Sequence, residues 1–155
     1  MVKPFSLQTL LDLSQLRMDE AGRRLSQLLA SEQEAGARVA LLQDYRAEYQ
    51  QRFVAAASAG IGRDAMNNFQ SFLCRLDEAI AQAQTLAEQS KQRTAAGQRE
   101  WLGQRVQVKA YDTLSARHIE REQRSANRQE QKLQDEHAAR GHFGSNPSGE
   151  PGDEE

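Results

Sequence analysis

Apolar residues recur alternately four and three positions apart along two long stretches of this chain. The first stretch comprises Leu7, Leu11, Ser14, Met18, Ala21, Leu25, Leu28, Glu32, Ala35, Val39, Leu42, Arg46, Tyr49 and Phe53, of which eleven are apolar. The second comprises Phe69, Leu73, Leu76, Ile80, Ala83, Ala87, Ser90, Thr94, Gly97, Trp101, Gln104, Val108 and Tyr111. This heptad spacing is typical of helices that pack lengthwise on one another. We call these residues the seam.

The two stretches are mirror images about Ile61. If the chain reverses there, Phe53 faces Phe69 and Leu42 faces Ile80, and the same register continues to the far end of both stretches. Facing apolar rows of opposite direction indicate an antiparallel pair. The sequence therefore predicts an all-α fold, in which two long helices form one antiparallel coiled-coil hairpin.

Turn-forming and capping residues set the expected boundaries. Ser6 is a candidate N-cap of helix one, Gly60 and Gly62 allow the reversal, and Asp64 can cap the returning helix. The expected hairpin spans residues 1–140, with helix one at about 6–57, a tip at 58–64, a longer helix two at about 65–140, and a disordered acidic tail at 141–155.

Composition agrees with helices rather than with a thick core. Only 38% of the 155 residues are hydrophobic and 6% aromatic, and no proline lies between Pro4 and Pro147. No apolar run approaches the ~18 residues of a membrane span, and the leucine-rich start lacks the pattern of a signal peptide. We therefore expect a cytoplasmic protein without direct membrane insertion.

Charge and cysteine content exclude further classes. The 20 basic and 22 acidic side chains are intermixed, so no nucleic-acid partner is expected. Cys74 is the single cysteine, which excludes an internal disulfide, and we expect it to pack beside the seam. His118, His137 and His142 lack metal-ligand spacing, and no phosphate loop or catalytic grouping is present. The sequence predicts no catalytic residue, no metal, no cofactor and no enzymatic activity.

The seam contains small and polar residues that test the predicted register. Thr94 and Gly97 would lie opposite Leu28 and Leu25, so large side chains would fill the space left by small ones. Gly36, Gly97 and Gly103 each lower helix stability by about 1 kcal/mol relative to alanine, so we expect weak points there. Arg46 would face Leu76, with its charged end at the rim.

Three aromatic residues near the tip are candidates for partner contact. Tyr45 and Tyr49 share a helix face, and either packing or partner binding would account for them. Phe72 lies beside the seam rather than in it, so it is either an exposed partner site or is buried where the helices splay.

Helix two becomes polar on every side from His118 onward. Such a helix either reaches a partner or frays.

Two runs and the tip together resemble the FliJ family of flagellar export proteins over roughly residues 6–140. The runs are Asp-Tyr-x-x-Glu-Tyr, which ends at Tyr49, and Phe-x-x-x-Leu-x-x-Ala-Ile, which begins at Phe72. The resemblance implies a coiled-coil stalk of the flagellar type III export apparatus, at the cytoplasmic face of the inner membrane. Its implied partners are the export ATPase ring, whose assembly and activity it promotes, the export-gate membrane protein, and export chaperones.

The resemblance also assigns candidate site residues. Phe72, Leu76 and Ala79 match the gate-facing pattern, whereas Ala83 stands where a histidine can occur in the family. The polar part of helix two is then the expected ring-entering segment, and its candidate ring contacts are Arg117, Arg121, Arg124 and Arg128.

Two other functions remain open from the residues themselves. A structural coiled-coil spacer would have a more uniform seam and no aromatic beside its tip. A secretion chaperone that binds clients along a helical groove would need a larger apolar groove than Phe72 and its neighbours provide.

Overall fold

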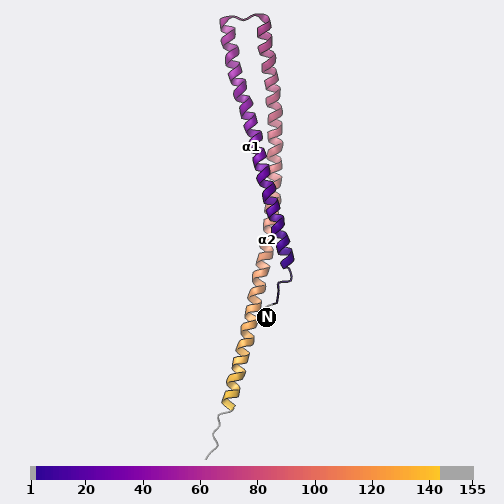
Figure 1. Ribbon diagram of the computed structural model, residues 1–155, viewed down its shortest axis with the longest axis vertical. Coiled ribbons are helices and arrows are strands. Elements are labelled where there is room, and N and C mark those ends of the chain that lie inside the picture. The colour runs from indigo at the N-terminus through magenta and orange to yellow at the C-terminus, as the bar shows by residue number, and fades with distance from the viewer. Residues whose placement is uncertain (1–2, 144–155) are drawn as a thin grey trace, which may run out of the picture. The chain divides into compact units, whose positions relative to one another are not determined.

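The computed structural model describes residues 3–143, and these form two helices without a strand (Figure 1). Helix α1 spans Gln8–Ala59 and helix α2 spans Arg63–Phe143. The predicted all-α pair of long helices, with the second one longer, is confirmed. Most of the predicted tail, residues 144–155, lies outside the described residues; 141–143 belong to α2.

The packing contacts divide into two units, which we describe separately. One unit contains Leu13–Val108, with most of α1, the interhelical loop and the first half of α2. The other contains Met1–Asp12 and Lys109–Glu155. Within 3–143, neither helix contains a segment apolar enough to cross a membrane.

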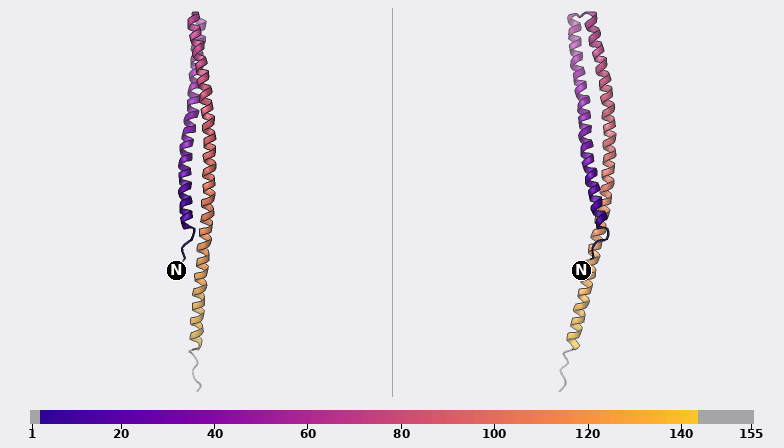
Figure 2. Two further views of the ribbon diagram at one scale, coloured as in Figure 1. Left: turned by 90° about the vertical axis from the view of Figure 1, so that its right-hand side faces the viewer. Right: turned by 45° about the vertical axis from the view of Figure 1, so that its right-hand side comes forward.

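In the Leu13–Val108 unit the two helices run side by side from the loop, as both views in Figure 2 show. Every seam residue of this unit is buried or half-buried. Ala21 is only 1% exposed beneath Trp101, whose ring lies against Gly22. The Phe53 and Phe69 rings are 5.5 Å apart, centre to centre. The predicted seam and register are therefore confirmed here.

The helices approach closely at Gly97 and Thr94. A Cβ atom at Gly97 would lie 2.6 Å from Leu28 Cδ1 and 3.8 Å from Leu25 Cδ1. The Thr94 hydroxyl lies 3.3 Å from the Leu28 carbonyl oxygen and 3.1 Å from that of Ser90, so it can donate to either. The large-opposite-small pairing is confirmed. Gly97 makes room for α1 in addition to weakening its own helix.

Two glycine substitutions should therefore change stability in opposite directions. Gly97→Val adds methyl groups where Leu28 already lies, and we expect it to destabilise the protein by about 1–3 kcal/mol. No atom lies within 4 Å of the corresponding position at Gly103. Gly103→Ala should therefore stabilise it by about 1 kcal/mol through helix propensity. Urea unfolding followed by circular dichroism measures both; equal stability of Gly97→Val and the unchanged protein would contradict the close approach.

The interhelical loop is shorter than the predicted tip. It comprises residues 60–62, because Ser58 and Ala59 continue α1 and the Ser58 hydroxyl donates to the Val54 carbonyl over 2.9 Å. Gly60 alone takes the left-handed conformation, at φ 90°, and its N–H donates to the Ala57 carbonyl over 3.2 Å. Asp64 lies in the first turn of α2, not before it, where a carboxylate interacts favourably with the helix dipole.

In the other unit, residues 3–7 cross α2 before α1 begins, and we call them the strap. His118 Nε2 lies 2.9 Å from the Lys3 carbonyl oxygen, and the Lys3 N–H lies 3.4 Å from Glu122 Oε2. The Phe5 and His118 rings are 5.7 Å apart. The Gln8 N–H donates to the Phe5 carbonyl over 3.1 Å, so the helix begins after the expected Ser6 and Leu7 start. The strap thus contacts α2 beyond the start of α1, although the strap itself is not helical.

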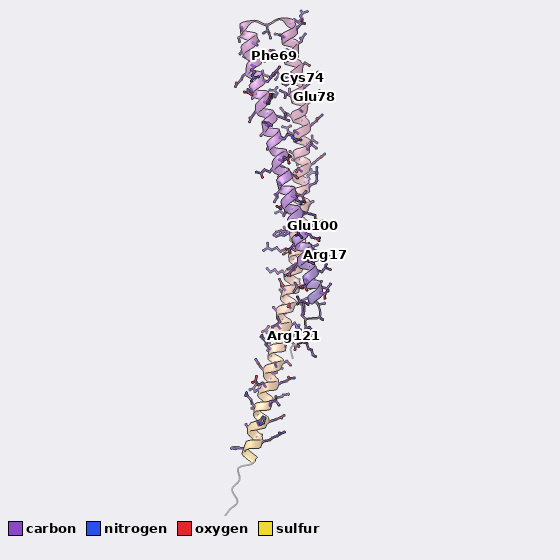
Figure 3. All side chains as sticks on the ribbon, viewed as in Figure 1. Arg17, Phe69, Cys74, Glu78, Glu100 and Arg121 are labelled. Atoms are coloured by element: carbon purple, nitrogen blue, oxygen red, sulfur yellow. The ribbon has the colours of Figure 1, made fainter. Side chains whose placement is uncertain are left out.

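Beyond Glu122, α2 has side chains on all sides of the ribbon (Figure 3). Residues 123–142 are all exposed, and the helix continues to Phe143. The helix is continuous through this polar segment, and contact with a partner stays a prediction.

Candidate functional site

Four aromatic rings cluster near the loop, where Figure 3 marks Phe69. Tyr49 of α1 lies between two rings of α2, with its ring centre 5.2 Å from Phe69 and 4.3 Å from Phe72. Phe53 contacts Phe69 from the other side. Tyr49 therefore has a packing role, and offset aromatic contacts of this kind add about 0.5–1.5 kcal/mol each beyond the buried area.

Phe72 is half-buried by this cluster. Its position beside the seam left exposure and burial open, and the contact with Tyr49 accounts for the burial. One part of the ring packs on Tyr49, and the part that stays accessible lies on the flank of the hairpin.

The other two gate candidates differ in exposure. Ala79 is half-buried on the same flank as Phe72, seven residues further along α2. Leu76 is only 8% exposed and lies in the seam with Leu73 and Ile80. Leu76 therefore lies in the interior of the hairpin, whereas Phe72 and Ala79 form part of the surface on this side of α2, which we call the flank.

Exposed side chains of α1 extend this flank. Tyr45 is 55% exposed and Leu41 is 64% exposed, four residues before it on the same helix face. Tyr45 is thus more exposed than Tyr49, which is half-buried.

Arg46 is half-buried in the seam, and its charged end reaches the rim as expected. Its Nε donates to Asp77 Oδ1, and its Nη2 lies 3.4 Å from Asp77 Oδ2. This hydrogen bond, with the charge of Asp77, raises the pKa of Arg46 above its ordinary value. The half-buried position is tolerated because the guanidinium reaches the rim.

A shallow groove lies between the helices beside the buried Ala83. Arg38 of α1 faces it together with Arg93 and Leu86 of α2, and Leu86 is 51% exposed. The seam pattern alone does not single out these residues. The signal that could have found them is the seven-residue spacing of Phe72, Ala79, Leu86 and Arg93.

The candidate ring-contact arginines are all exposed on α2. Arg117, Arg121, Arg124 and Arg128 are spaced by four, three and four residues, so they share one helix face. Arg124 Nη2 pairs with Glu120 Oε1 at 2.6 Å, and Arg121 Nε donates to the Arg117 carbonyl over 3.3 Å. This face is cationic and fully accessible to an anionic surface.

The strap is the second feature that the sequence analysis missed. Its partners on α2, His118 and Glu122, continue the four-three spacing of the seam beyond Tyr111 through Ser115. That continuation, with Phe5 ahead of the first helix, is the signal that could have predicted it.

The part of the chain that the structure describes has few side chains placed to bind a metal or to react. Within 3–143, no three of its His, Cys, Asp and Glu residues come close enough to hold a metal ion. Cys74 is exposed, contrary to the expected packing, because it lies one residue past the seam position Leu73 and faces outward.

Comparison with known proteins identifies relatives over most of the chain. The family model described as "Flagellar FliJ protein" matches residues 3–147. The flagellar FliJ proteins of Salmonella typhi and of Escherichia coli strain K12 are each 30% identical over 135 residues. These alignments cover 87% of this chain and 92% of each relative. The match includes both candidate surfaces, the flank near the loop and the arginine-bearing face of α2.

Proposed function

This chain belongs to the FliJ family of flagellar proteins, and from that premise we propose that it is a non-enzymatic stalk of the flagellar type III export apparatus. In this proposal it promotes assembly and activity of the export ATPase ring, links the ring to the export gate, and receives export chaperones. It acts at the cytoplasmic face of the inner membrane.

The observation that carries the proposal is the continuous exposed helix of residues 123–142. A polar helix without a neighbour among residues 3–143 gains little from folding alone, since most helical stability in proteins comes from the packing of an apolar face. A ring that surrounds this segment supplies the missing contacts. Mixed charge with few apolar anchors favours an interface that forms and separates readily.

The gate contact is proposed at the flank formed by Phe72, Ala79 and Tyr45. An accessible aromatic beside exposed apolar side chains is typical of the centre of a protein interface. Tyr49 and Leu76 hold this surface in place from within the hairpin. The flank and the arginine-bearing face belong to different units of the chain, so the proposal assigns each of the two partners its own surface.

ATP hydrolysis by the cognate export ATPase, with and without this protein, tests the proposal. We expect the protein to increase the rate and to be retained by the immobilised gate protein in a parallel pull-down. If the hydrolysis rate is unchanged and the gate protein does not retain this chain, the proposal is contradicted. A structural spacer would then be the remaining interpretation. Binding of unfolded export clients in the absence of ATPase stimulation would indicate the chaperone function instead.

A further inference from the structure

One face of α2 in its exposed segment is predominantly basic. We call it the basic face; it comprises Arg117, Arg121, Arg124, Arg128 and Lys132, all exposed. With about 100° between successive helical residues, these five side chains fall within an arc of about 80°. Only Arg124 has a carboxylate partner among the described residues, Glu120. Asp135 lies within the same arc, so the face has five basic side chains and one carboxylate and keeps a cationic surplus.

The opposite face of the same segment is different in character. It presents Ile119 and Leu133, which are 49% and 59% exposed, with Ala126 between them. A helix that lies on a lipid bilayer has a basic face opposite an apolar face rich in Trp, Phe and Leu. Here the opposite face has only two large apolar side chains, fourteen residues apart, and Glu122 and Glu130 lie beside them, so the basic face suits an anionic polypeptide better than a membrane.

The chain itself contains such a polypeptide. Glu150, Asp153, Glu154 and Glu155 form an acidic cluster in the sequence, outside the described residues. The match to the family model ends at residue 147, so this cluster is a feature of this chain beyond the matched region. Four carboxylates would face five basic side chains.

Chain geometry permits the contact. At ~1.5 Å per residue, Arg128 lies about 22 Å back along the helix from Phe143, and Arg121 about 33 Å. An extended chain spans up to ~3.3–3.6 Å per residue, so Glu150 can be about 24 Å from Phe143 and Glu155 about 40 Å. The acidic cluster can therefore reach Arg128 and Arg121 without any change in α2.

We propose that the acidic cluster, residues 150–155, binds the basic face of the same molecule. Each pair between exposed groups is weak, but the short connection to α2 holds the cluster at a millimolar effective concentration. The contact weakens as salt rises, because the Debye length falls from ~10 Å at 0.1 M to ~3 Å at 1 M. The acidic cluster would then compete with an acidic partner for the same arginines; this regulatory consequence rests on the proposed function, whereas the contact itself does not.

Paramagnetic relaxation enhancement on the full chain tests the contact. A nitroxide is attached at Ser148→Cys in a Cys74→Ser background, and amide signals are compared at low and high salt. We expect loss of the signals of residues 117–128 at low salt and their recovery at high salt. The matched control replaces the acidic cluster by Glu150→Gln, Asp153→Asn, Glu154→Gln and Glu155→Gln, and in it the signals should persist at both salt concentrations.

Three results would overturn the proposal. One is equal signal loss with the charged and the neutralised cluster. Another is equal loss in Arg121→Gln/Arg124→Gln/Arg128→Gln and in the unchanged protein, with Arg23→Gln/Arg63→Gln/Arg99→Gln as the charge-matched control. The third is signal loss in isotope-labelled protein mixed with separate nitroxide-labelled molecules, which would place the cluster on a second copy.

Measuring stimulation of the export ATPase distinguishes this inference from the proposed function. If both hold, the neutralised cluster should lower the protein concentration needed for half-maximal stimulation. A protein that never stimulates the ATPase but shows the salt-sensitive signal loss would contradict the proposed function and support the intramolecular contact.

Discussion

Reversing three charges on α2, with Arg121→Glu, Arg124→Glu and Arg128→Glu, should abolish stimulation of the export ATPase. These side chains are exposed and share one helix face, so the substitutions remove only the exposed Arg124–Glu120 pair and the Arg121 hydrogen bond to the Arg117 carbonyl. Close charge pairs at protein interfaces contribute about 1.5–7 kcal/mol. Losing even one such pair weakens binding at least about tenfold, since ~1.4 kcal/mol corresponds to a factor of ten. The measurement is the hydrolysis rate as a function of protein concentration.

Gate binding provides the internal control for this prediction. The reversed residues lie in the unit with Lys109–Glu155, whereas the flank with Phe72 lies in the unit with Leu13–Val108. The charge-reversed protein should therefore bind the gate as the unchanged protein does, with the same helical circular dichroism. Normal ATPase stimulation by the charge-reversed protein would exclude the basic face as the ring contact.

Phe72→Ala should weaken binding to the export gate at least about tenfold, because an accessible aromatic of this kind is typical of the few residues that dominate an interface. Its free energy of unfolding should also fall, by roughly 1–2 kcal/mol, since the ring is half-buried against Tyr49. Isothermal titration with the gate's cytoplasmic region, at a temperature where both proteins are folded, measures the first effect. Urea unfolding measures the second.

Phe69→Ala separates these two effects. Phe69 also contacts Tyr49, at 5.2 Å between ring centres, but it is a seam residue that faces α1. Phe69→Ala should therefore lower stability and leave gate affinity nearly unchanged. If both variants lose affinity in proportion to their loss of stability, the aromatic cluster supports the hairpin and Phe72 is not itself a contact.

Much of the fold could be predicted because heptad spacing directly reflects how helices pack. All residues of the two seam stretches are buried or half-buried, including polar ones such as Ser14 and Thr94. The loop was less predictable, since both Gly60 and Gly62 permit a left-handed turn and only Gly60 adopts it. The strap was not predicted, because residues 3–7 are not helical and periodicity does not describe them.

The candidate sites were predictable in position but not in exposure. The outward arginines of α2 follow from helical spacing alone. The burial of Phe72 depends on which way its ring turns relative to Tyr49, and the tilt of Arg46 depends on the carboxylate of Asp77 one residue from its seam partner. Such side-chain directions are set by tertiary contacts, which a one-dimensional pattern does not contain.

The strap has one more consequence, for how the start of the chain tolerates change. Both hydrogen-bonding groups that Lys3 offers to His118 and Glu122 belong to its main chain, so the side chain at position 3 contributes nothing to them. The Phe5 ring is the one strap side chain that stacks on an α2 ring. The number of residues between Phe5 and Gln8 is therefore under tighter constraint than their identity. An inserted residue would shift the Phe5 ring relative to His118, whereas Lys3 could be replaced by any residue except proline, which has no N–H to donate to Glu122.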